Sequence, residues 1–265
     1  MFLFNLEMWY QLFIENDDLK NPSLSLNSFI WEVFNFQAII LAAGCGTRMN
    51  LTTEKIPKCL LPIGKTTILD RQIDILIKNG INDIIIVVGY ESDIIKKHFF
   101  NKNIKIVYNK NYKKYDNLFS IWCAKNFIKN DFLCIYGDLV FDNRLISSFL
   151  DNDNDCLIVD MPTDKPDNHS VIIKNSLIQN IDFDFINNIS SGQFIGISKF
   201  TNLSVNLFKK ALDTFEQNDD LNGEFIRLID FLLKEIDLHA FFIKDKIWIN
   251  VNNKEKFNLA QNIFG

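Results

Sequence analysis

An apolar, strand-like segment runs directly into a glycine-containing loop within Ala38–Met49, which reads Ala-Ile-Ile-Leu-Ala-Ala-Gly-Cys-Gly-Thr-Arg-Met. Gly44 and Gly46 lack a Cβ, so backbone N–H groups can approach phosphate groups closely. Arg48 can bind phosphate oxygens through two parallel hydrogen bonds, whereas Lys58, ten residues further on, acts as a mobile point charge. The segment therefore predicts a buried strand followed by a triphosphate-binding loop.

The loop differs from two common phosphate-binding motifs. A P-loop has Gly-Lys-Ser/Thr at its end, but Gly46 is followed by Thr-Arg-Met. The dinucleotide-binding fingerprint needs a third glycine, where this chain has Met49. From Ala38 onward the string Leu-Ala-Ala-Gly-x-Gly-Thr-Arg, with a later Pro-Lys, resembles the signature of the sugar-nucleotide and phosphocholine nucleotidyltransferases. The resemblance implies nucleotide contacts from Leu41, Ala42, Ala43, Gly44, Cys45, Gly46 and Thr47.

Strand and helix patterns alternate along the chain from residue 37 to about residue 150. The β-branched run Ile84–Val88 indicates a strand buried on both faces, and Ile68–Lys78 has helical spacing that ends before Gly80. This order predicts a doubly wound α/β fold with a mostly parallel, mixed sheet flanked by helices, a Rossmann-type fold like that of the nucleotide-diphospho-sugar transferases. The other predicted elements are strands at 38–42, 104–108, 132–136, 156–161, 170–174, 193–197, 238–243 and 247–251, and helices at 91–100, 118–129, 205–215, 224–235 and 254–263.

Three residues that directly follow predicted strands, Gly44, Gly89 and Asp138, are expected at one crevice, because ligands bind beyond the carboxyl ends of strands in such sheets. Asp138 can hold a hard divalent cation through oxygen. It resembles the metal-binding aspartate of the family, which implies Mg²⁺. The family's second carboxylate falls at Asn252, whose amide oxygen can bind Mg²⁺ without contributing charge. Asn250 is the alternative if the register differs by two residues.

The segment Tyr115–Trp122 (Tyr-Asp-Asn-Leu-Phe-Ser-Ile-Trp) resembles the phosphocholine cytidylyltransferase branch, which implies CTP as the nucleotide. Asn117 and Ser120 are three residues apart at a predicted helix start, so they could face the site together. The alternative for Asn117 is a helix cap. Positions that read or flank the base in the family correspond to Gln72, Gly89 and Tyr90.

Glu224 resembles an acid on the acceptor side of the same branch, although it could equally stabilise a helix start through the helix dipole. Arg227 lies one turn further on, and an acceptor with both an amine and a carboxylate would suit this pair. A quaternary ammonium pocket should contain aromatic rings, and the loop 167–169 shows no Trp or Tyr. The acceptors compatible with the branch are phosphocholine, 2-aminoethylphosphonate and an amino-acid phosphate such as phosphoglutamine.

The resemblance implies a CTP-dependent cytidylyltransferase in which an acceptor oxygen attacks the α-phosphorus of CTP. Arg48 would stabilise pyrophosphate, Lys58 would hold the two reacting phosphates together, and Asp138 with Asn252 would hold Mg²⁺. The product would serve surface polysaccharide or lipid decoration in a bacterium. One alternative is a sugar-1-phosphate nucleotidyltransferase using UTP, dTTP or GTP, against which Tyr115–Trp122 argues. The other is a non-catalytic, nucleotide-binding regulatory protein, which Asn252 favours.

Charge and cysteine usage exclude several other classes. The net charge is −5 and there is no long basic run, which argues against nucleic acid as a partner. The five cysteines form no Cys-x-x-Cys pair, so neither a zinc site nor a disulfide framework is indicated. The three histidines, expected to be at the surface or structural, are His98, His169 and His239.

The apolar, aromatic residues 1–36 are expected to form a helical extension packed on a single nucleotidyltransferase domain at 37–265. A homodimer contact and a membrane-surface contact are the alternatives for this segment. It lacks the basic start of a secretory signal, and no segment reaches the roughly 18 apolar residues of a membrane-spanning helix. The sequence therefore predicts a cytoplasmic protein.

Overall fold

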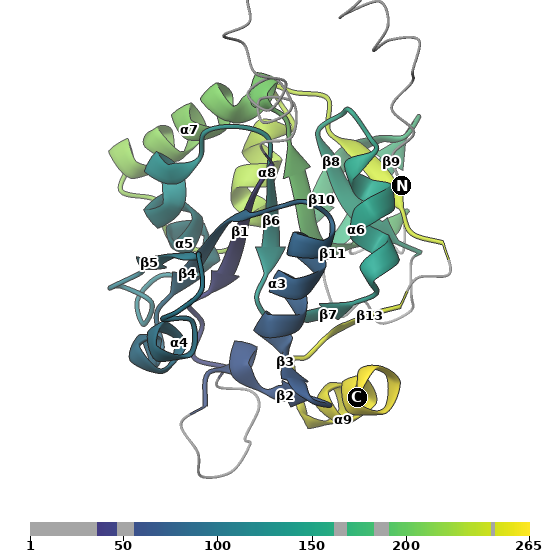
Figure 1. Cartoon of the computed structure of the whole chain (residues 1–265). Helices are drawn as coiled ribbons and strands as arrows, with labels where there is room; N and C mark the ends of the chain where they lie inside the picture. The colour runs from purple at the N-terminus through teal and green to yellow at the C-terminus, as the bar shows by residue number, and fades with distance from the viewer. Residues whose placement is uncertain (1–35, 47–55, 162–168, 183–190, 245–246) are drawn as a thin grey trace, which may run out of the picture. The chain divides into compact units, whose positions relative to one another are not determined.

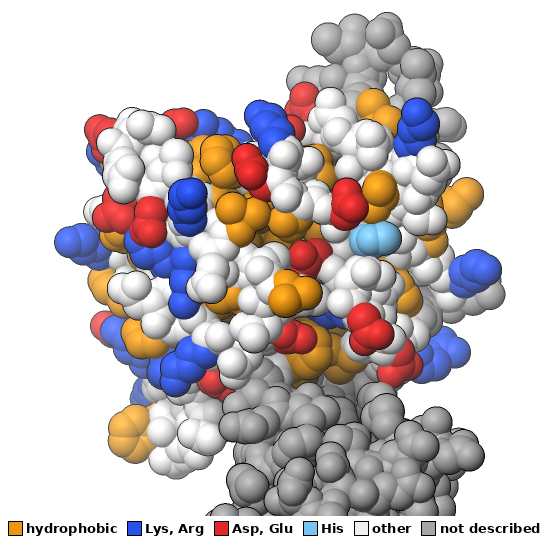
Figure 2. All heavy atoms as spheres, turned by 90° about the horizontal axis from the view of Figure 1, so that it is seen from above, with side chains coloured by type: hydrophobic (Ala, Val, Ile, Leu, Met, Phe, Trp, Pro, Cys, Tyr) orange, Lys and Arg blue, Asp and Glu red, His pale blue; other side chains and the backbone are white. Residues whose placement is uncertain are grey.

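The structure is a computed structural model that describes residues 36–46, 56–161, 169–182, 191–244 and 247–265. The predictions for residues 1–35, Thr47, Arg48 and the loop at 167–168 fall outside these ranges. Within them, no helix combines the length and apolarity needed to cross a membrane. On the face shown in Figure 2, acidic and basic side chains are interspersed.

A nine-stranded mixed sheet forms the centre of the described part (Figure 1). Its strands are β1 (Gln37–Ala42), β4 (Asp83–Val88), β5 (Lys105–Tyr108), β6 (Phe132–Tyr136), β8 (Cys156–Asp160), β9 (Ser170–Lys174), β10 (Leu177–Asp182), β11 (Gly192–Phe200) and β12 (His239–Phe242). They lie in the order β5-β4-β1-β6-β11-β8-β12-β10-β9. The first four strands in that order are parallel, and β11 is antiparallel to both of its neighbours. The predicted doubly wound, mixed α/β fold is thereby confirmed.

Helices cover both faces of the sheet (Figure 1). They are α3 (Ile68–Lys78), α4 (Ser92–His98), α5 (Asn117–Ala124), α6 (Asn143–Leu150), α7 (Asn202–Gln217), α8 (Ile226–Leu232) and α9 (Lys254–Phe264). The buried side chains of α5, α7 and α8 share one hydrophobic cluster with the sheet, and those of α3, α4 and α6 share another. Every residue of β1 is buried because helices pack on both of its faces.

Helix α3 illustrates how local sequence sets an element's limits. The Thr67 side chain accepts a hydrogen bond from the backbone N–H of Asp70 and caps the first turn. Leu69, Ile73 and Leu76 recur at helical spacing and are buried against the sheet. The helix ends before Gly80, which has a φ of +84°, a conformation that glycine adopts without strain.

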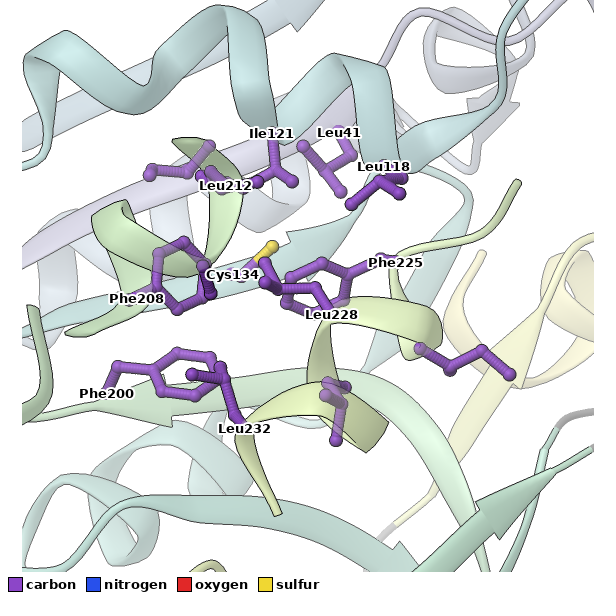
Figure 3. Close-up of a cluster of buried hydrophobic side chains, with 14 of the residues drawn as sticks. Leu41, Leu118, Ile121, Cys134, Phe200, Phe208, Leu212, Phe225, Leu228 and Leu232 are labelled. Carbon is purple, nitrogen blue, oxygen red and sulfur yellow. The ribbon is translucent and has the colours of Figure 1, made fainter. Parts of the chain in front are cut away.

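Phenylalanine fills much of the core between the sheet and the α7–α8 pair. The Phe132 ring stacks on Phe200 at 5.3 Å and meets Phe208 edge-on at 5.0 Å. Figure 3 shows Phe200, Phe208 and Phe225 lying in the same cluster as Cys134 of β6. Full burial of one such ring contributes about 1.5–3 kcal/mol, so this layer holds α7 and α8 firmly against the sheet.

Two small strand pairs complete the part that positions the site. In one, β7 (Leu139–Phe141) pairs with β13 (Trp248–Asn250), and Asn250 lies opposite Leu139. Next to this pair, the N–H of Val251 donates to the carbonyl of Asp138 at 2.9 Å. The other pair is the hairpin of β2 (Pro62–Ile63) and β3 (Thr66–Thr67). The pairing of β7 with β13 brings the C-terminal segment beside the turn that follows β6.

Candidate active site

A cavity of about 630 Å³ opens where β1 and β6 end. Of the residues predicted to bind or act on the nucleotide and metal, the wall contains Leu41, Ala42, Ala43, Gly44, Cys45, Gly46, Lys58, Asn117, Ser120, Asp138 and Asn252. The predicted acceptor residue Glu224 also lines the wall. Segments spread over most of the described chain therefore meet at one site, at the carboxyl ends of the parallel strands.

Gly137 allows the ends of β1 and β6 to approach each other. Its N–H donates to the carbonyl of Leu41 at 3.0 Å. A Cβ at this position would lie 2.8 Å from that carbonyl oxygen and 2.9 Å from the Cβ of Ala42. Only glycine fits there without moving the strand ends, and the next residue, Asp138, is thereby presented to the cavity.

The Lys58 ammonium lies between two oxygens that were predicted to be metal ligands. Lys58 begins the short 3-10 helix η3 (Lys58–Leu60). Its Nζ is 2.6 Å from Asp138 Oδ2 and 2.7 Å from Asn252 Oδ1. The Lys58 and Asp138 side chains are 15% and 26% exposed. The structure therefore brings together the predicted catalytic pair and the predicted second metal ligand.

The two oxygens on the Lys58 ammonium show that this position suits a cation. Within the described ranges, no group of three or more His, Cys, Asp or Glu side chains could hold a metal ion. Mg²⁺ in nucleotide sites is usually bound by one or two carboxylates together with waters and substrate phosphates. Asp138 and Asn252 fit that partial donor set.

The loop after β1 is shaped by Gly46. Its φ of +61° lies in the left-handed region, and a Cβ there would lie 3.3 Å from the Cβ of Lys58. Burial raises the pKa of the neighbouring Cys45 thiol, and burial also raises the pKa of the Cys59 thiol to about 12. Both thiols are thus protonated at neutral pH, and neither offers a thiolate to a metal or substrate.

Gln72, Gly89 and Tyr90, predicted to contact the base, do not line the cavity. A Cβ on Gly89 would lie 2.5 Å from the Cβ of Tyr112 and 2.7 Å from the carbonyl oxygen of Ala43. The N–H of Tyr90 donates to that same carbonyl at 3.1 Å. Gly89 and Tyr90 therefore pack against Ala43, which lines the cavity, and do not line it themselves.

Gln72 supports the turn that carries Asp138. It is 1% exposed, and its side-chain amide donates to the carbonyls of Tyr136 at 2.9 Å and Leu139 at 2.7 Å. These two carbonyls flank the turn between β6 and β7. Gln72 thus holds the turn in place, where the sequence had suggested base recognition.

We expect Gln72→Met to lower the free energy of unfolding by about 1–3 kcal/mol, because it leaves two buried carbonyls without a donor. Activity should fall as well, since the turn that carries Asp138 loses its support. Urea denaturation followed by circular dichroism measures the first effect. Gln217→Met, at the exposed end of α7, is the matched control, and an unchanged urea midpoint for Gln72→Met would contradict this role.

The start of α5 contributes amide and hydroxyl groups. Asp116 caps the helix by accepting from the N–H of Asn117 at 2.8 Å, so Asn117 is not the cap. The Asn117 side-chain oxygen accepts instead from the N–H of Phe225. Ser120 is buried and accepts from the Asn109 amide at 3.1 Å. Asn109 also lines the cavity and was not predicted, although its place directly after β5 is the same signal that identified Asp138.

A histidine–carboxylate pair forms another part of the wall. His169 Nε2 lies 2.9 Å from Glu224 Oε2, with the two side chains 3% and 30% exposed. The nearby Tyr136 hydroxyl is buried. Burial, and then the negative charge of Glu224, raises the pKa of Tyr136 well above its usual value. Tyr136 is therefore a neutral phenol, and His169 is a site residue that sequence reasoning expected to be structural.

Arg227, predicted to act with Glu224 on the acceptor, does not line the cavity. Its guanidinium lies 2.6 Å and 3.1 Å from the two carboxylate oxygens of Asp220, and it also donates to the carbonyl of Asn222. Gly223, with a φ of +96°, would place a Cβ 2.8 Å from the Arg227 side chain. The structure therefore assigns Arg227 to bracing the 220–223 loop.

Arg227→Ala is expected to change the KM of any acceptor by no more than about twofold, because it removes an exposed ion pair outside the cavity. Steady-state kinetics over a range of acceptor concentrations would measure this. Arg144→Ala, which removes a similar surface pair with Asp142, is the matched control. A selective rise in acceptor KM for Arg227→Ala alone would restore the predicted acceptor role.

Two lysines that were not predicted line the cavity beside aromatic rings. The Lys113 ammonium lies 5.9 Å from the centre of the Tyr112 ring, and the Lys114 ammonium lies 4.6 Å from the centre of the Tyr115 ring. Lys114 also donates to the Tyr115 hydroxyl at 2.8 Å. The Tyr115 ring stacks on Phe119 at 4.7 Å. This part of the wall is therefore both aromatic and positively charged.

Comparison with known proteins assigns the class to which this fold and site belong. Residues 38–186 match the MobA-like NTP transferase domain, and this match covers more than half of the chain. The chain belongs to the MobA-like NTP transferase family and carries a nucleotidyltransferase domain.

Individual relatives cover only parts of the chain. The chain is 40% identical over 135 residues to the bifunctional protein GlmU of Methanococcus maripaludis. The aligned region covers 51% of this chain and 32% of that protein. It is 36% identical over 110 residues to the choline-phosphate cytidylyltransferase of Streptococcus pneumoniae. That aligned region covers 40% of this chain and 47% of that protein. The chain thus spans less than half of each of these relatives.

The fold also matches solved structures. The CTP:phosphocholine cytidylyltransferase LicC from Streptococcus pneumoniae superposes with a TM-score of 0.77 at 22% identity. The superposition covers 87% of this chain and 100% of that one. At this identity the match establishes the shared fold.

Proposed function

We propose that this chain transfers CMP from CTP to a small phosphorylated or phosphonate acceptor and releases pyrophosphate. The observation that carries the proposal is the Lys58 ammonium held by Asp138 and Asn252 beside a glycine loop. Similarity to a choline-phosphate cytidylyltransferase supports CTP as the donor. We place the reaction in the cytoplasm and its product in bacterial surface polysaccharide or lipid decoration.

In the proposed reaction, an acceptor oxygen forms a bond to the α-phosphorus of CTP. The bond from that phosphorus to the oxygen bridging to the β-phosphate breaks, and pyrophosphate leaves with the electron pair. No general base is needed, because the attacking phosphate or phosphonate oxygen is already anionic. Lys58 offsets the repulsion between the two anionic reactants, and the N–H groups around Gly44 and Gly46 bind the departing phosphates.

Asp138 and Asn252 are the residues that would hold Mg²⁺. When bound, the ion neutralises charge on the phosphate oxygens during transfer. With only one carboxylate in this pair, the protein contributes less negative charge than two carboxylates would. We therefore propose that the nucleotide supplies most of the ligands. In the structure the Lys58 ammonium balances the charge of Asp138.

Pyrophosphate release tests the proposal. Each of the four NTPs would be assayed with Mg²⁺ against phosphocholine, phosphoethanolamine, 2-aminoethylphosphonate, phosphoglutamine and glucose-1-phosphate. We expect turnover with CTP and an amine-bearing acceptor. Turnover with glucose-1-phosphate alone would favour the sugar-phosphate reaction, and CTP binding without any turnover would favour a regulatory, nucleotide-binding protein.

A further inference from the structure

The His169–Glu224 pair has the form of a carboxylate prepared for a ligand. His169 is almost fully buried and contacts one carboxylate oxygen, Oε2, whereas Glu224 is partly exposed in the cavity wall. The buried imidazole fixes the orientation of the carboxylate, and the contact with Oε2 leaves Oε1 for another donor. Tyr136 lines the same wall, and its hydroxyl is buried.

Among the described residues, the aromatic rings in the cavity wall are already in contact with other groups of the protein. The ammonium groups of Lys113 and Lys114 lie over the Tyr112 and Tyr115 rings, respectively. The Tyr115 ring also stacks on Phe119. The Tyr136 ring packs so closely on β11 that a Cβ at Gly196 would lie 2.8 Å from it. A trimethylammonium group has no N–H donor and depends on open aromatic faces, and these rings offer it few.

We propose that His169 is a positioning residue that orients Glu224 to bind a protonated primary amine of the acceptor. The acceptor is then a phosphorylated or phosphonate primary amine and not a quaternary ammonium compound. This inference rests on the proposed transfer reaction. A primary ammonium group brings N–H donors, and the Glu224 carboxylate can accept a charge-assisted hydrogen bond from one of them.

Stepwise methylation of one acceptor isolates the feature that matters. Phosphoethanolamine and its mono-, di- and trimethyl derivatives all keep the positive charge, but they lose N–H donors one at a time. Binding would be measured by isothermal titration calorimetry to the full chain with Mg²⁺ and α,β-methylene-CTP, so that no turnover is required. We expect affinity to fall by about tenfold or more from the primary amine to phosphocholine, as for loss of hydrogen bonds to a charged group.

Binding and turnover then separate the two ideas. Equal or tighter binding of phosphocholine, or no binding by any member of the series, overturns the amine assignment. Tight binding of the primary amine without pyrophosphate release rejects the transfer reaction and keeps the amine assignment. Turnover that favours phosphocholine supports the transfer reaction and rejects the amine assignment.

Variants of the pair test the role of His169. Glu224→Gln should weaken binding of the primary amine by about 10- to 100-fold, because it removes the charge and keeps the shape. His169→Ala should raise the acceptor KM by about tenfold with the CTP KM unchanged. His169→Gln should largely restore it, since its amide can donate to Glu224. His239→Gln is the control, and equal losses for CTP and acceptor, or no rescue by His169→Gln, would overturn the positioning role.

Discussion

Replacing Lys58 by methionine is expected to lower kcat by about 10²–10³-fold, which corresponds to roughly 3–4 kcal/mol of barrier, as for loss of one donor that stabilises an oxyanion. The expectation follows from the position of its ammonium, 2.6 Å from Asp138 and 2.7 Å from Asn252. Lys58 also lines the cavity, so its ammonium can reach phosphate groups bound there. Methionine keeps most of the side-chain volume and removes only the charge and the donors.

Single-turnover measurements with saturating CTP would report the chemical step for Lys58→Met. Lys65→Met, in the exposed turn between β2 and β3, controls for the general effect of removing one positive charge. Thermal denaturation of both variants separates folding from chemistry. A loss of less than tenfold for Lys58→Met would rule out the proposed role of this lysine.

Asp138→Asn is expected to reduce kcat/KM by about 10²-fold or more, because a bound divalent ion provides several kcal/mol of charge stabilisation. Asn252 is uncharged, so the substitution would remove the one negative charge of the predicted metal pair. Binding of Mn²⁺, followed by electron paramagnetic resonance in the presence of α,β-methylene-CTP, should weaken in parallel. This second readout does not depend on turnover.

A variant that relocates the charge sharpens the test of Asp138. Asn252→Asp combined with Asp138→Asn keeps one carboxylate and one amide in the pair but exchanges them. We expect it to recover part of the Mn²⁺ affinity lost in Asp138→Asn. Asp151→Asn, at the C-terminal end of α6, is the surface control. Normal metal binding and activity in Asp138→Asn would show that this carboxylate does not hold the ion.

Most of the sheet and its helices could be predicted from the sequence, because their patterns are local. The limits of α3 and β9 agree with the predicted ranges, since a capping threonine and a compact apolar run define them. Strand β10 was missed because a register shift between Ile178 and Asn180 interrupts its alternation. Helix α6 was also missed, although Asp142 caps its first turn and Leu145, Ile146 and Phe149 are buried on one face. The predicted helix at 118–129 is α5 followed by the 3-10 turn η4 (Lys125–Phe127).

The site likewise contains residues that could be predicted from the sequence and contacts that could not. Lys58, Asp138 and Asn252 were predicted because each occupies a recognisable place in a family motif. The pairing of His169 with Glu224 depends on long-range contacts, including the hydrogen bond from the N–H of Phe194 to the His169 carbonyl at 2.8 Å. No local sequence pattern predicts such a long-range contact.

The pairing of β7 with β13 has a consequence for when the cation position is completed during synthesis. Asp138 is synthesised near the middle of the chain. Asn252 is synthesised much later and reaches Lys58 only when β13 pairs with β7. A growing chain that has already folded β1, β4 and β6 still lacks one of the two oxygens on Lys58. Almost the whole domain must leave the ribosome before both oxygens can contact Lys58. A nascent chain therefore cannot form the complete site early in synthesis.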